Sequence, residues 1–150
     1  MNKIAFPQPL EVAEAVFDIK NLDGETFQDF ILRHHETLLT IESITSGEMP
    51  PETEYENKVK KWASLESSAN ANTAILEGYE QQATGLLHNY YRRKNLTSVE
   101  AGREAKAYLG IFREIAGRWS QAAKSIMSRK IQAMSHLKRM REEYRGAGSQ

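Results

Sequence analysis

The chain contains no cysteine, so it has no disulfide, no thiolate metal ligand and no cysteine nucleophile. Proline and glycine are few, with four and nine among 150 residues, which leaves little material for loops. No apolar run approaches the roughly 20 residues that span a bilayer, and the first residues lack the apolar stretch of a secretory signal. From these absences we expect a cytoplasmic protein with no membrane contact.

Patterns that mark common catalytic and ligand sites are missing as well. There is no G-x-G-x-x-G or G-K-[ST] phosphate loop and no G-x-S-x-G nucleophile elbow. His34 and His35 are adjacent, and neighbouring side chains on a helix point about 100° apart, so this pair cannot readily chelate one ion. We therefore expect no metal, no cofactor and no enzymatic activity, while catalysis by residues outside these motifs stays open.

Charge is balanced over the whole chain but not along it. Residues 1–100 hold 9 Lys/Arg and 16 Asp/Glu, a net of −7, whereas residues 101–150 hold 11 and 4, a net of +7. One interpretation is that the acidic part neutralises the basic part within the fold. The other is that the basic part contacts nucleic acid.

The apolar residues follow helical spacing over most of the chain. After Pro50 and Pro51, two long helices are predicted at about 51–94 and 98–145, each roughly 65–70 Å long at about 1.5 Å per residue. Asn95 suits a left-handed helix end, and Thr97 with Glu100 matches a capping box that starts the next helix. A short turn between two long helices predicts an antiparallel helical hairpin.

The final helix carries apolar residues at alternating steps of three and four, the spacing of a coiled-coil seam. They are Ala105, Tyr108, Phe112, Ile115, Trp119, Ala122 and Ile126. Beyond Ile126 the apolar stripe changes register, as in a stutter that presents a second partner surface. Its residues are Met127, Ile131, Met134, Leu137, Met140 and Tyr144.

The N-terminal third predicts two shorter helices. The first runs from about residue 9 to 21, with a brief strand at 16–19 as the alternative, and the second runs from about 25 to 45 with Asp23 as its N-cap. The fold class is therefore all-α, a coiled-coil-like three- or four-helix bundle. We predict one helical domain over 1–150, made of an arm (1–8), short helices (9–45), the hairpin (51–145) and a tail (146–150).

The glycines inside the predicted long helices need an explanation, because each lowers helix stability by roughly 1 kcal/mol relative to alanine in an exposed helix interior. Close approach of a neighbouring helix is one explanation, and breaks at Gly78 or Gly110 are the other. Polar residues at 67–72 also thin the apolar stripe, which indicates either a polar position in the seam or a local kink.

Two capped helices with long apolar stripes and no catalytic motif favour a non-enzymatic interaction protein, such as an adaptor, an assembly subunit or a regulatory inhibitor. We expect a protein partner or a homo-oligomer that contacts Tyr108, Phe112, Trp119, Ile126, Met127, Met134 and Leu137. The alternative is a nucleic-acid-binding regulator, in which cations contact phosphates beside Tyr90 and Tyr91. Those cations are Arg92, Arg93, Lys94, Arg129, Lys130, Lys138, Arg139, Arg141 and Arg145.

Overall fold

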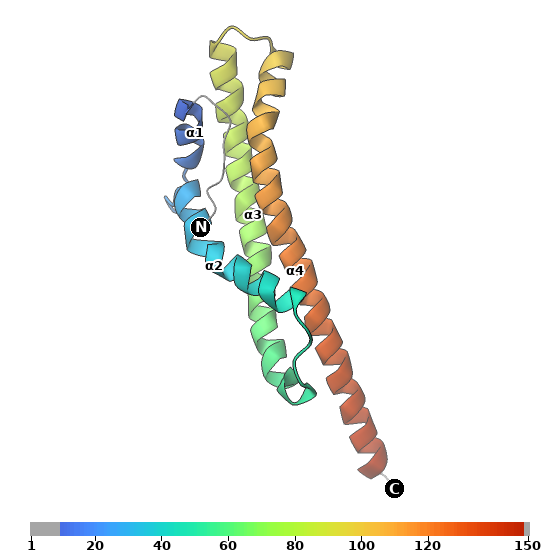
Figure 1. Ribbon diagram of the computed structural model, residues 1–150. Coiled ribbons are helices and arrows are strands. Elements are labelled where there is room, and N and C mark those ends of the chain that lie inside the picture. Colours follow the sequence, from blue (N-terminus) through green and yellow to red (C-terminus); the bar gives the residue numbers. More distant parts are fainter. Residues whose placement is uncertain (1–9, 149–150) are drawn as a thin grey trace. The chain divides into compact units, whose positions relative to one another are not determined.

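The computed structural model describes residues 10–148, which fold almost entirely as α-helix (Figure 1). The elements are α1 (Leu10–Phe17), α2 (Phe27–Ser46), a 3₁₀ turn (Glu52–Glu54), α3 (Tyr55–Arg93) and α4 (Ser98–Gly148). Helices α3 and α4 form the predicted antiparallel hairpin, so the all-α fold class is confirmed. The predicted arm and residues 149–150 lie outside the described residues, whereas 146–148, expected in the tail, belong to α4.

The described residues form two compact units, and α2, α3 and α4 each contribute to both. Unit 1 combines the chain through His35 with Asn72–Arg118, and unit 2 combines Glu36–Ala71 with the chain from Trp119 onward. Each unit therefore contains one half of the α3–α4 hairpin, and the two halves are described in turn.

The turn between α3 and α4 has the predicted chemistry. Asn95 has a φ of 65°, the left-handed conformation that ends α3. The Thr97 backbone N–H donates to the Glu100 carboxylate at 2.9 Å, and the Glu100 N–H donates to the Thr97 hydroxyl at 3.2 Å. This reciprocal pair is a capping box, and it fixes the start of α4 at Ser98.

The start of α2 differs from the prediction, because Thr26 and not Asp23 is its N-cap. The Thr26 hydroxyl accepts the Asp29 backbone N–H at 3.1 Å. Asp23 instead lies in a turn where the Asn21 side chain accepts its backbone N–H at 2.9 Å and Gly24 has a φ of 82°. The alternative strand at 16–19 is also wrong, since α1 continues through Phe17.

Unit 1 has an aromatic core. The Phe27 ring lies 4.4 Å from the Phe112 ring and 5.4 Å from the Tyr79 ring, measured between centroids, and all three side chains are buried. The Tyr79 hydroxyl donates to the Glu25 carbonyl at 2.8 Å, so the polar end of this buried ring is satisfied. From α1, Val12 and Val16 are also buried, so segments of α1, α2, α3 and α4 all contribute to this core.

Unit 2 has a thinner core in which alanines are frequent. Its large buried side chains include Trp62 of α3, Ile41 of α2 and Ile126 of α4. Small residues complete the contact between α3 and α4, namely Ala69, Ala122, Ala123 and Ala133. Small side chains let helices approach closely, but they bury less apolar surface per residue than aromatic ones.

The buried face of α4 keeps one register along its length, unlike the predicted change after Ile126. Continuing the steps of three and four from Ala122 and Ile126 reaches Arg129, Ala133 and His136, which are buried or half-buried. We call this row the seam of α4. The sequence pattern concealed its continuation, because an arginine and a histidine, Arg129 and His136, occupy positions where apolar residues are expected.

The glycines inside the long helices neither break the helices nor allow close packing. Helices α3 and α4 run without interruption through these positions, and an added Cβ would meet no atom within 4 Å at any of them. They are Gly78, Gly85, Gly102, Gly110 and Gly117. Both explanations offered by the sequence are therefore wrong. The polar stretch at 67–72 does place Asn72 in the buried face of α3, with 4% of its surface exposed.

Candidate interaction surface on helix α4

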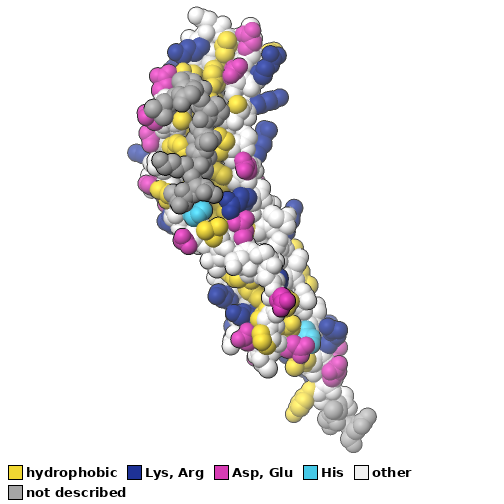
Figure 2. Space-filling view, viewed as in Figure 1, with side chains coloured by type: hydrophobic (Ala, Val, Ile, Leu, Met, Phe, Trp, Pro, Cys, Tyr) yellow, Lys and Arg dark blue, Asp and Glu magenta, His cyan; other side chains and the backbone are white. Residues whose placement is uncertain are grey.

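The second half of α4 carries a row of apolar side chains on its outer side. Met127, Ile131 and Met134 are 42%, 51% and 49% exposed, and they follow one another at steps of four and three residues. That spacing puts them on one helical face, distinct from the seam. We call these three residues the lateral stripe. Figure 2 shows hydrophobic side chains among charged ones at the surface of this part of the protein.

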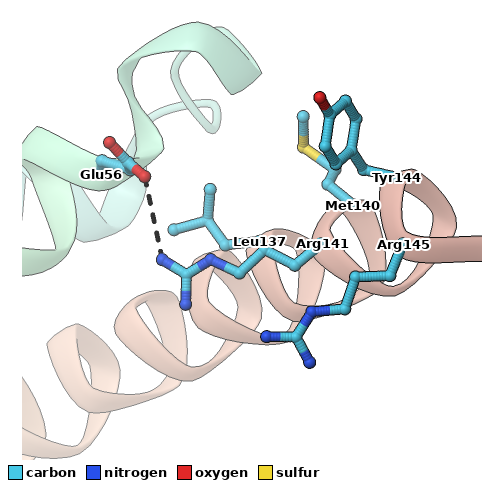
Figure 3. Close-up of a pocket in the computed structure, with 6 residues that line it drawn as sticks. All are labelled: Glu56, Leu137, Met140, Arg141, Tyr144 and Arg145. Atoms are coloured by element: carbon cyan, nitrogen blue, oxygen red, sulfur yellow. Dashed lines mark ion pairs between the residues drawn. The ribbon is translucent and has the colours of Figure 1, made fainter. Parts of the chain in front are cut away.

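A second apolar surface lies near the C-terminal end of α4. Leu137, Met140 and Tyr144 share an open groove with Glu56, Arg141 and Arg145, which we call the terminal groove. In Figure 3 the Met140 and Tyr144 side chains lie next to each other, while Arg141 extends toward Glu56 of α3. Tyr144 is 83% exposed, so most of its ring is open to solvent.

The residues predicted to contact a protein partner divide into two groups. Tyr108, Phe112, Trp119 and Ile126 are between 0% and 3% exposed and belong to the core of the chain itself. They offer no surface to a partner in this fold. Met127 and Met134 lie in the lateral stripe, and the half-buried Leu137 lies in the terminal groove. The candidate surface is therefore the second half of α4.

Two of the cations predicted to contact nucleic acid have structural roles. The guanidinium of Arg129 donates to the Thr45 carbonyl at 3.1 Å and to the Gly47 carbonyl, at the C-terminal end of α2. Carbonyls at a helix end lack partners in the helix, so a cation there satisfies them and complements the helix dipole. The Lys130 ammonium lies 2.6 Å from the Glu66 carboxylate of α3, and both side chains are largely buried.

Farther along α4 the charged contacts become more exposed. His136 Nε2 lies 3.2 Å from the Glu52 carboxylate and faces the edge of the Tyr55 ring at 5.3 Å. Arg141 lies 3.8 Å from the Glu56 carboxylate, with the two side chains 70% and 72% exposed. Lys138, Arg139 and Arg145 are also exposed. In unit 2, carboxylates before and within α3 thus meet basic side chains of α4, as the interpretation of internal neutralisation expects.

The other predicted phosphate-binding cations lie at the hairpin turn in unit 1. Arg92 donates to the Leu96 carbonyl at 3.1 Å, and the Lys94 ammonium lies 5.4 Å from the centre of the Tyr90 ring, while Arg93 is exposed. The Tyr90 hydroxyl donates to the Glu11 carboxylate at 2.8 Å, a bond that raises the pKa of Tyr90. Tyr91 is buried, so it offers no open ring face for stacking.

The histidine pair shows no arrangement suited to metal binding. The His34 ring packs 4.7 Å from the Phe30 ring, and burial lowers its pKa. Among residues 10–148, no group of three or more His, Asp or Glu side chains gathers in a way that could hold a metal ion. No helix in that range is long and apolar enough to cross a membrane.

Comparison with protein-family models, curated proteins and solved structures finds no match. Function is therefore inferred from the surfaces of α4 themselves.

The site also contains residues that the sequence analysis placed in the shifted apolar stripe but did not name among the expected partner contacts. Ile131 completes the lateral stripe, and Met140 and Tyr144 complete the terminal groove. Their signal was present in the sequence, because all three belong to the helically spaced apolar residues beyond Ile126. Glu56 carried no such signal, because its role depends on the position of α3 beside α4.

Proposed function

We propose that the chain is a non-enzymatic interaction protein, an adaptor, assembly subunit or regulatory inhibitor, and that the second half of α4 binds another protein. The observation that carries this proposal is the series of exposed apolar residues on that half of the helix. The seam of the same helix is already covered by α3 and α2, so the exposed residues are not required for the contact between the helices of the chain.

The energetic reason is the burial of apolar surface. Burying a fully exposed apolar side chain contributes about 1.5–3 kcal/mol, so covering each of these half-exposed side chains stabilises a complex by roughly half of that, and several together offset part of the cost of association. Met127 and Met134 have flexible thioether side chains that adapt to an irregular partner surface. Contiguous exposed apolar residues rimmed by charges are typical of protein interaction sites.

The test uses matched baits for affinity purification from the native host, with nuclease treatment and mass spectrometry. A stripe variant, Met127→Ser/Ile131→Ser/Met134→Ser, should lose the protein partner that the unaltered chain captures. A control variant, Leu22→Ser/Val99→Ser, changes two apolar residues that are at least as exposed but lie in unit 1, and it should keep that partner.

All five substituted side chains are exposed, so both variants should melt close to the unaltered protein, within roughly 0.5 kcal/mol per site. A partner that is retained by the stripe variant would contradict the proposal. So would capture that disappears on nuclease treatment, because the bound species would then be nucleic acid.

A further inference from the structure

The terminal groove differs from the rest of the α4 surface in two respects: other helices cover less of it, and it carries more positive charge. Beyond Leu137 every α4 residue through Gly146 is exposed. Figure 1 shows α4 of unit 2 continuing past the start of α3. Between residues 138 and 146 there are four cations, Lys138, Arg139, Arg141 and Arg145, and two carboxylates, Glu142 and Glu143. The groove therefore lies on a helix end with an excess of positive charge.

Within unit 2, both apolar side chains and carboxylates from other parts of the chain contact α4. Lys130 meets Glu66 at 2.6 Å, His136 meets Glu52 at 3.2 Å and Arg141 meets Glu56 at 3.8 Å. Within unit 2 the fold itself thus places carboxylates of α3 and of the preceding turn against basic side chains of α4, beside apolar residues that face α4. Past Arg141, no carboxylate of residues 10–148 is within ion-pair distance of Arg145.

The lateral stripe leads into the same charged region. Continuing its steps of four and three from Met134 reaches Lys138, Arg141 and Arg145 on one helical face. A helix that lies along this face meets apolar side chains first and cations afterwards. Its complement is a helix with apolar residues at one end and carboxylates at the other.

We infer that the terminal groove binds an acidic amphipathic helix of a partner protein. Apolar side chains of that helix pack on Leu137, Met140 and Tyr144, and its carboxylates pair with Arg141 and Arg145. This inference rests on the proposed function and adds the chemistry of the partner. The same end of α4 from a second copy carries the same excess of cations, so pairing two such ends is opposed by like charge. Nucleic acid supplies phosphates but no aliphatic surface to cover Leu137 and Met140.

A selection experiment on the full chain tests the partner's chemistry. The probe is a phage-displayed library of randomised helical peptides, selected on the unaltered protein and counter-selected on a Met140→Ser/Tyr144→Ser variant. Peptides that depend on the groove should be net negative, with apolar residues at steps of three and four. Their dissociation constants should rise with salt, because salt screens exposed charges.

Charge reversal then tests the pairing directly. Arg141→Glu/Arg145→Glu should weaken binding of the selected peptides about tenfold or more, since two exposed pairs are lost and replaced by repulsion. The control Arg103→Glu/Lys106→Glu reverses two exposed cations of α4 in unit 1 and should leave binding unchanged. All four of these residues are exposed, and thermal melts check that each variant remains folded.

Several results would overturn the inference. They are groove-dependent peptides that are neutral or basic, the absence of any groove-dependent peptide, and peptides equally bound by both charge-reversed variants. A single-stranded oligonucleotide whose binding is lost on Arg141→Glu/Arg145→Glu would assign the groove to nucleic acid. A dimer in sedimentation that dissociates on the same change would assign it to a second copy. In each case loss of the native partner from the stripe variant would still support the proposed function.

Discussion

Units 1 and 2 each contain one half of the same helical hairpin, but different segments of the chain pack against the two halves. In unit 1, α1 and the first part of α2 pack over α3 and α4, and aromatic rings such as Phe27 and Phe112 fill the space. In unit 2, the rest of α2 is the additional helix, and many core side chains are alanines. The exposed apolar residues of unit 1, such as Leu22 and Val99, are separate from one another, whereas most of those of unit 2 follow one another along α4.

This difference separates the residues that hold the fold together from those available to a partner. Where a helix pair is covered on several sides, its apolar residues are used within the chain. Where other helices cover only part of a helix, some of its apolar residues stay exposed, while the seam residues of the same helix remain buried. Substitutions in the two units should therefore have opposite profiles, with stability most sensitive in unit 1 and binding most sensitive in unit 2.

The largest expected effect is the loss of an aromatic ring from unit 1. Phe112→Ala should lower the free energy of unfolding by about 3–5 kcal/mol, because it removes a fully buried ring and leaves a cavity beside Phe27. The matched change Met134→Ala in unit 2 should alter it by less than roughly 0.5 kcal/mol, since this side chain is half exposed. Urea unfolding of both variants measures the difference, and equal losses would contradict the assignment of Phe112 to the core and of Met134 to an exposed surface.

The second effect concerns the contact that joins α2 to α4 in unit 2. Arg129→Met keeps most of the apolar stem but removes the donors to the Thr45 and Gly47 carbonyls. We expect a loss of about 1.5–3 kcal/mol in the free energy of unfolding, the usual range for hydrogen bonds to a charged group. Lys124→Met, at an exposed position of the same helix, is the control. If both variants unfold at the same urea concentration, the Arg129 contact has no stabilising role.

Alkaline pH should act on unit 1 through its buried tyrosines. Burial, followed by the nearby Glu25 charge, raises the pKa of Tyr79 to about 12, and burial, followed by Tyr108, raises that of Tyr91 to about 12. The unfolded value is about 10. Because both pKa values are higher in the folded protein than in the unfolded chain, the two neutral tyrosines contribute to the free energy of unfolding. This contribution is complete below about pH 10 and is lost as the pH rises toward about 12.

For each tyrosine the expected loss near pH 12 is on the order of 2 kcal/mol. Urea unfolding across this pH range measures it, and a Tyr79→Phe variant should show a smaller dependence on pH than the unaltered protein. An identical pH dependence in the variant would exclude Tyr79 as a cause.

Much of the fold followed from local chemistry that the sequence displays directly. Asn95, Thr97 and Glu100 carry their conformational preferences wherever they occur, so the end of α3 and the start of α4 were predictable. The start of α2 was not, because both Asp23 and Thr26 are good N-caps. The choice between them depends on how the Asn21 side chain folds the preceding turn.

The candidate site was predictable only in part, for a different reason. A stripe of apolar residues in a sequence indicates a surface that is stabilised by burial. It does not show whether other helices of the same chain or a partner protein cover that surface. Tyr108 and Met134 both belong to apolar stripes of α4, but Tyr108 follows the seam and is buried, whereas the face that carries Met134 is left half exposed. The role of Arg129 was hidden similarly, because its acceptors are backbone carbonyls that carry no sequence signal.

The smallest effect, and one of opposite sign, concerns the glycines in the helices of unit 1. Gly78→Ala and Gly110→Ala should each raise the free energy of unfolding by about 0.5–1 kcal/mol, because alanine restricts the unfolded chain and favours the helix. An added Cβ meets no atom within 4 Å at either position, so no clash offsets this gain. Gly24→Ala is the matched control, since its space is also open but its φ is +82°.

At Gly24 a side chain is strained by the backbone itself, and we expect a loss of stability of about 1 kcal/mol. Thermal melts of the three variants compare the signs directly. A destabilised Gly78→Ala variant would mean that another surface lies close to this face of α3 in solution, for example one from a second copy. Because Gly78 belongs to unit 1, that result would place an interface on unit 1, and it would reverse the assignment of binding to unit 2.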